Sequence, residues 1–188
     1  LNNAIKVAKN NKNVLIFVGT TTQIEGEGFD RKNINLPENQ IKLINEIYRY
    51  NKNIILINFS GSAVDLTNIS KKVKAILHAW LPGQAGGSAL ADIIFGEISP
   101  SGKLSETFPN CLENNPSYLY FPGNINEVNY NEEIFVGYRY YDKKKIDVKY
   151  PFGYGLTYTT FEYSNIKVSS KELSENDEIE VSFKIKNT

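Results

Sequence analysis

The feature that most constrains the fold is a repeated order of short apolar runs and helical segments. Three runs are almost entirely apolar, which is typical of strands buried on both faces: VLIFVG at 14–19, NIILINFS at 53–60 and KAILHAWLPG at 74–83. Segments with helical spacing of apolar residues lie between and around them, at 1–12, 36–51 and 86–97. This alternation predicts an α/β fold, with a mostly parallel sheet flanked by helices in a flavodoxin-like α/β sandwich.

The pattern changes from about residue 98. Extended segments broken by proline and glycine follow, and then two stretches rich in aromatic residues, at 133–142 and 150–164. From residue 161 onward, apolar and polar residues alternate with the period of a strand. We therefore expect an α/β domain over 1–160 and the first strands of an incomplete β-sandwich over 161–188.

Composition excludes several classes of function. The 21 basic and 21 acidic residues balance, so we expect neither a nucleic-acid partner nor a membrane partner, and the KKK at 143–145 indicates a solvated turn. A single cysteine, Cys111, excludes an internal disulfide and a Cys-based zinc site, and a single histidine excludes a His cluster. No cofactor is expected. His78 has no G-x-S-x-G serine in the sequence to activate, which favours a packed imidazole over a catalytic base.

The two ends of the chain indicate a piece of a larger protein. The first residues do not resemble a signal peptide and lack an initiating methionine, and the last residues stop inside an alternating strand pattern. The single cysteine favours a cytoplasmic location, with secretion as the alternative.

The strongest candidate for a site is the loop QIEGEGFDRKNINLP at 23–37, directly after the first apolar run. Ligands of doubly wound sheets bind beyond the carboxyl ends of the strands, where this loop lies. Its glycines do not match a phosphate-binding pattern, and its two glutamates would repel phosphate. Two interpretations stay open on local sequence: a solvated turn, or a loop that holds Glu25 or Glu27 over a cleft for acid–base chemistry. A glycosidase would need a second carboxyl group, which must then lie elsewhere.

A set of separated motifs supports the second interpretation, and they occur in this order: EGEGFDRKNINLPENQIKLI, GSAVDL, AWLPGQAGGSALADIIFGEISPSGKLSETFP, NPSYLYFPG, EIFVGYRYYD and YPFGYGLTYTTFEYS. Their order and spacing resemble glycoside hydrolase family 3, in its C-terminal α/β-sandwich domain and the start of its fibronectin type III-like domain. The resemblance covers essentially the whole chain. Within the family, it is similar to the β-glucosidase branch.

The resemblance implies a retaining, exo-acting β-glycosidase. A β-glucosidase that removes terminal non-reducing β-D-glucosyl residues from β-linked glucosides or oligosaccharides is expected first, and β-xylosidase specificity is the alternative. An N-terminal (β/α)8 barrel, absent from this chain, would supply an aspartate nucleophile, so the chain alone is expected to be inactive. The competing hypotheses are a non-catalytic carbohydrate-binding or scaffold module and a nucleotide-binding domain.

The motif also implies roles for single residues of the loop. Glu27, directly before G-x-D-R, corresponds to the family's acid/base glutamate, and Glu25 is the alternative. Asp30 and Arg31 match the motif too, and we expect them to order the loop by a salt bridge or by capping the next helix. Phe29, beside the proposed acid, is the candidate for a contact with the aglycone.

Overall fold

The computed structural model describes all residues from Leu1 to Thr188. The chain divides into two compact units. Unit 1 contains residues 1–90 and 103–154, and unit 2 contains residues 91–102 and 155–188.

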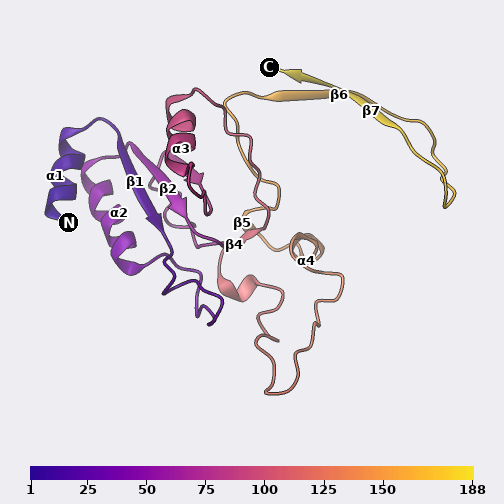
Figure 1. Ribbon diagram of the computed structural model, residues 1–188, viewed down its shortest axis with the longest axis horizontal. Helices are drawn as coiled ribbons and strands as arrows, with labels where there is room; N and C mark the ends of the chain where they lie inside the picture. Colours follow the sequence, from indigo (N-terminus) through magenta and orange to yellow (C-terminus); the bar gives the residue numbers. More distant parts are fainter. The chain divides into compact units, whose positions relative to one another are not determined.

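A three-stranded parallel sheet forms the centre of unit 1 (Figure 1). Its strands are β1 (Val14–Gly19), β2 (Ile54–Phe59) and β3 (Ala75–His78), in the order β1-β2-β3. Two helices, α1 (Asn2–Asn10) and α2 (Glu38–Tyr50), lie side by side next to β1. The central strand β2 is the most deeply buried, and its Ile54, Leu56 and Ile57 have no exposed surface. The predicted α/β fold with a parallel sheet is confirmed.

The third apolar run is a strand over only part of its predicted length. β3 pairs with β2 up to His78, opposite Asn58, and then ends. Two residues end it: Trp80 has a positive φ of 51°, which strands do not adopt, and Pro82 has no N–H to donate to a neighbouring strand. Because the sheet ends here, the loop after β3 begins five residues earlier than the apolar run suggests.

The remainder of unit 1 packs against the end of the sheet. It contains α3 (Gly86–Phe95), which continues into unit 2, the short antiparallel pair β4 (Phe108–Pro109) and β5 (Val148–Tyr150), the turn η1 (Leu112–Asn114), and α4 (Tyr138–Lys144). Phe108 is almost fully buried, and its ring packs edge-on against His78 at 5.0 Å between centroids. This contact joins the proline-rich second half of the chain to the parallel sheet.

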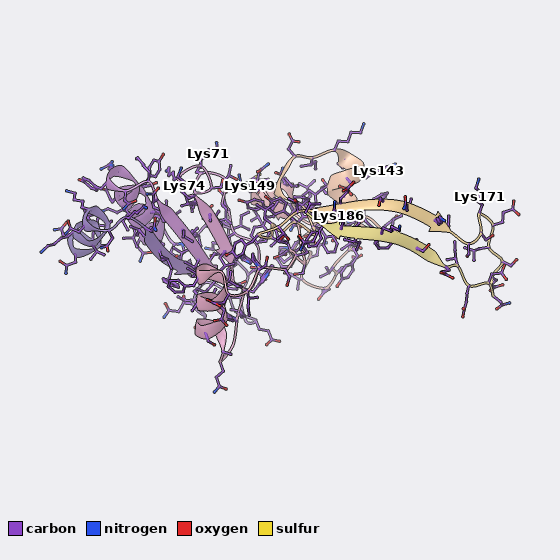
Figure 2. All side chains as sticks on the ribbon, turned by 90° about the horizontal axis from the view of Figure 1, so that it is seen from above. Lys71, Lys74, Lys143, Lys149, Lys171 and Lys186 are labelled. Atoms are coloured by element: carbon purple, nitrogen blue, oxygen red, sulfur yellow. The ribbon has the colours of Figure 1, made fainter.

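The basic run at 143–145 lies at the end of α4, where its side chains are exposed (Figure 2). Cations at the C-terminus of a helix are favoured by the helix dipole. The helix was not expected from the sequence. None of the helices in residues 1–188 is both long and apolar enough to cross a membrane.

Unit 2 consists of the C-terminal part of α3 and an antiparallel hairpin of β6 (Phe161–Val168) and β7 (Val181–Asn187). The Tyr158 hydroxyl donates to the carbonyl oxygen of Ile93 at 2.6 Å, which holds the segment before β6 against α3. Every residue of both strands is exposed. That a fibronectin type III-like domain begins at residue 161 stays a prediction.

Candidate active site

The loop after β1 carries a tight turn with Glu27 at its tip. Gly26 and Phe29 pair as an isolated antiparallel bridge, so Glu27 and Gly28 are the two residues that connect them. Glu27 is exposed, and no hydrogen bond of the structure holds its carboxylate. The phenyl ring of Phe29 lies over Gly26, since a Cβ on that glycine would be 3.0 Å from the ring. With 46% of its surface exposed, Phe29 keeps area for a further contact beside Glu27.

The start of the loop is fixed to the sheet and to α2. The Gln40 side chain of α2 bonds Gly19 twice, accepting from its N–H at 2.9 Å and donating to its carbonyl oxygen at 3.0 Å. The next N–H, that of Thr20, donates to the carbonyl oxygen of Phe59 in β2 at 3.0 Å. The loop therefore leaves the carboxyl end of β1 in a defined direction, as expected for a ligand-binding position in a parallel sheet.

Glu25 contrasts with Glu27, because it is bound to the loop that follows β2. Its carboxylate accepts hydrogen bonds from the Ser62 hydroxyl at 2.5 Å, from the Gly61 N–H at 3.0 Å and from the Thr20 hydroxyl. Gly61 and Ser62 lie at the carboxyl end of the neighbouring strand. Glu25 thus connects the loops of two adjacent parallel strands.

These contacts keep Glu25 in its ionised form. Partial burial acts to raise the pKa of Glu25, but the hydrogen bonds from Ser62, Thr20 and Gly61, together with the positive charge of Arg31, outweigh it and lower the pKa below its ordinary value of 4.5. A general acid must hold a proton at the working pH. In this chain the contacts of Glu25 therefore favour its charged form.

Arg31, which follows the turn in sequence, contacts the same loop after β2 that Glu25 contacts. Its Nη1 donates to the Ser62 hydroxyl at 3.0 Å and to the carbonyl oxygen of Ala63 at 3.5 Å. Asp30 is exposed, and α2 begins after Pro37 without a side-chain cap. Of the pair Asp30 and Arg31, Arg31 is therefore the residue that ties the loop down, and it does so through the loop after β2.

A third charged residue, Glu106, lies close to this group. Burial raises the pKa of Glu106; the Ala63 N–H and Arg31 act in the opposite direction, while Glu25 adds to the increase. Its Oε1 is buried without a hydrogen-bond partner, as are Nε and Nη2 of Arg31. Sequence reasoning set Glu106 aside as a candidate, and it missed Ser62 and Thr20. Only the register of the parallel strands, which places the ends of β1 and β2 side by side, would have indicated Ser62 and Thr20.

A chain of buried polar groups continues from Ser62 into the sheet. The Ser60 hydroxyl donates to the carbonyl oxygen of Ser62 at 2.9 Å, and Nδ2 of Asn58 donates to the Ser60 hydroxyl at 3.0 Å. Asn58 Nδ2 also lies 2.8 Å from Nδ1 of His78. His78 packs edge-on against Trp80 and Phe108. This environment is that of the packed imidazole predicted from the sequence.

The stability of the chain is expected to fall between pH 6.5 and about 4 because of His78. Burial lowers the pKa of His78 to about 4, although the charge of Glu25 opposes the decrease. In this window the unfolded histidine binds a proton and the folded one does not, so acid favours unfolding. Thermal unfolding measured at a series of pH values should show the decrease, and His78→Asn, which keeps an acceptor for Asn58, should reduce it. If the stability of His78→Asn falls as steeply with decreasing pH as that of the original chain, His78 is not the cause of the decrease. The contribution of Glu25 is lost at lower pH, below about 4.5.

Metal-dependent chemistry is not indicated by the side chains of residues 1–188. No three or more histidine, cysteine, aspartate or glutamate side chains gather there in a group that could hold a metal ion.

Comparison with known proteins identifies the family. Residues 1–158 match the glycosyl hydrolase family 3 C-terminal domain. The thermostable β-glucosidase B of Acetivibrio thermocellus is 50% identical over 187 residues, which is all of this chain and 25% of that protein. An exo-α-(1→6)-L-arabinopyranosidase of Bifidobacterium longum is 45% identical over 88% of this chain and 22% of its own length.

A solved structure agrees with these relatives. The crystal structure of the GH3 β-glucosidase of Bifidobacterium adolescentis matches with a TM-score of 0.93 and 42% identity, over all of this chain and 27% of that one. The chain spans about a quarter of the length of the relatives it matches. The resemblance inferred from the sequence motifs is confirmed: the chain belongs to glycosyl hydrolase family 3, and residues 1–158 form its C-terminal domain.

Proposed function

We propose that the chain is the C-terminal part of a retaining β-glucosidase and supplies the acid/base residue, Glu27. The observation that carries this assignment is the separation of the two glutamates. Glu25 is held by three hydrogen bonds, whereas Glu27 is exposed at the tip of a turn. A catalytic acid must reach the glycosidic oxygen of a bound substrate, and the exposed position of Glu27 supports its assignment over Glu25.

The reaction requires a second carboxyl group from the rest of the protein. Since the chain spans about a quarter of its relatives, the other three quarters have room for the (β/α)8 barrel and its aspartate nucleophile. Glu27 protonates the departing glycosidic oxygen while that aspartate attacks the anomeric carbon. Glu27 then takes a proton from the water that releases the sugar. In retaining enzymes the two carboxyl groups are about 5–5.5 Å apart.

The substrate class is a terminal β-D-glucoside. β-Glucosidases are found both among the curated relatives and among the matching solved structures. The arabinopyranosidase at 45% identity shows that C-terminal domains this similar also occur in enzymes named for another pyranoside. We assign the choice of sugar mainly to the barrel, and the loop to the chemistry common to all of these enzymes.

A full-length protein containing this chain should hydrolyse a β-glucoside with retention. The test is proton NMR of the reaction with an aryl β-D-glucoside, with the aryl β-D-xyloside in parallel. β-Glucose should form before mutarotation produces the α-anomer, and the glucoside should react faster than the xyloside. The 188-residue chain alone is the control without a nucleophile. Initial release of the α-anomer would contradict retention, and no hydrolysis of either substrate would favour a non-catalytic module.

A further inference from the structure

We propose that Glu25 is a positioning residue, which holds the loop through Ser62 in the form that presents Glu27 to the substrate. The proposal rests on the function proposed above for Glu27. It gives the second glutamate of the loop a role in the reaction without placing it in contact with the sugar.

Both sides of the turn are tied to one hydroxyl group, that of Ser62. Ser62 donates to Oε1 of Glu25 at 2.5 Å and accepts from Nη1 of Arg31 at 3.0 Å. Glu25 precedes the turn and Arg31 follows it, so the residues between them, including Glu27, are held at both ends. Without this link the glycines on either side of Glu27 would leave its backbone free to move.

Ser62 is itself held by the buried part of the sheet. Its carbonyl oxygen accepts from Ser60, which in turn accepts from Asn58 of β2, and neither Ser60 nor Asn58 has exposed surface. A catalytic group is placed more precisely when the residues that support it belong to rigid elements. Here the support reaches from the exposed turn to the central strand through hydrogen bonds.

The charge of Arg31 also favours a permanently ionised Glu25. Arg31 contacts the carbonyl oxygen of Ala63 at 3.5 Å, and its charge acts to lower the pKa of both Glu25 and Glu106. The guanidinium group is thus in the field of two carboxyl groups, Glu25 and Glu106. An ionised Glu25 balances Arg31, and a Glu25 that exchanged protons in each turnover would lose that balance. The arrangement therefore assigns proton transfer to Glu27 and fixed charge to Glu25.

Positioning and simple stabilisation of the fold predict different kinetics. If Glu25 positions Glu27, its loss affects most strongly the substrates whose leaving group needs a proton. A displacement of about 1 Å can cost about 10²-fold in rate. If Glu25 only stabilises the fold, its loss lowers the melting temperature and reduces the rates of all substrates equally.

The experiment compares kcat/KM for 2,4-dinitrophenyl β-glucoside, which needs no protonation, and for methyl β-glucoside, which does. Glu25→Gln in the full-length protein should lower kcat/KM for the methyl glucoside by about 10²-fold and for the activated substrate by less than about fivefold. Ser62→Ala should show the same selective loss on the methyl glucoside. Ser62→Thr keeps the hydroxyl and should retain the original kcat/KM for both substrates. Thr20→Val removes one bond to Glu25 and provides a milder variant that keeps the fold. Glu38→Gln makes the same chemical change at an exposed site on α2 and should leave both rates unchanged.

Each outcome separates the two proposals. Equal losses on both substrates, or no loss, in the Glu25, Ser62 and Thr20 variants would overturn the positioning role while leaving the role of Glu27 intact. If Glu27→Gly keeps normal activity on methyl β-glucoside, the proposed function itself fails. If Glu25→Gln shows a larger selective loss than Glu27→Gly, Glu25 is the acid/base residue and both proposals are wrong.

Discussion

Glu27→Gly in the full-length protein is expected to lower kcat/KM for methyl β-glucoside by about 10³-fold, within the range that general acid–base catalysis contributes. The methoxide leaving group needs a proton, and Glu27 is the glutamate of the loop whose carboxylate no hydrogen bond holds. For 2,4-dinitrophenyl β-glucoside the first step should be almost unchanged, because this leaving group departs as a stable anion. Its kcat should fall, however, since no base remains to activate water in the second step.

Stopped-flow measurement of dinitrophenolate release distinguishes these steps. The variant should show a burst equal to the enzyme concentration, followed by a slow steady state, because the glucosyl-enzyme accumulates. Glu133→Gly is the matched control: it removes an exposed glutamate whose φ of 49° suits glycine. Its dinitrophenolate release should match that of the protein without the substitution. If Glu27→Gly loses kcat/KM equally on both glucosides and shows no burst, Glu27 is not the acid/base residue.

Gly19→Ala is expected to destabilise the protein by about 3 kcal/mol or more, at the upper end of the cost of overpacking. A Cβ at this position would lie 1.9 Å from the carbonyl oxygen of Phe59, which belongs to the backbone of β2 and cannot rotate away. Relief of this clash requires the ends of β1 and β2 to separate. That movement would also break the two hydrogen bonds between Gly19 and Gln40 that fix the start of the catalytic loop.

Chemical denaturation of the 188-residue chain or of the full-length protein measures this effect. Gly28→Ala is the control, since a Cβ there meets no atom within 4 Å, and its free energy of unfolding should change by less than about 1 kcal/mol. Comparable stability of the two variants would show that the strand ends are not as tightly packed as the structure describes. In the full-length protein, Gly19→Ala should also lose activity at temperatures where it remains folded.

The strands and helices that follow from the local order of apolar residues were predicted best. The run at 14–19 is a strand over that whole range, and Pro37, expected at the first position of the second helix, precedes it by one residue. The third strand is shorter than the run at 74–83 predicts, because that run contains no signal for the positive φ of Trp80 that ends β3. α4 was missed because its tyrosines favour strands and its seven residues are too few to show a helical period.

The candidate loop shows a similar limit. The motif selected Glu27 and kept Glu25 as the alternative, but no local property separates two glutamates that are each followed by a glycine. What separates them is Ser62, which is 37 residues from Glu25 in the sequence and is brought close by the parallel pairing of β1 and β2. The expected loop-ordering role of Arg31 has a physical basis in its bond to the same hydroxyl, whereas Asp30 is exposed.

The central claim, that Glu27 exchanges the proton, is tested most directly by azide rescue. Azide attacks the glucosyl-enzyme without the help of a base, so it should raise kcat of Glu27→Gly on 2,4-dinitrophenyl β-glucoside and give β-glucosyl azide as the product. The same treatment of Glu25→Gly should yield mainly glucose. If azide leaves the rate of Glu27→Gly unchanged and β-glucosyl azide forms only with Glu25→Gly, the assignment of Glu27 is wrong.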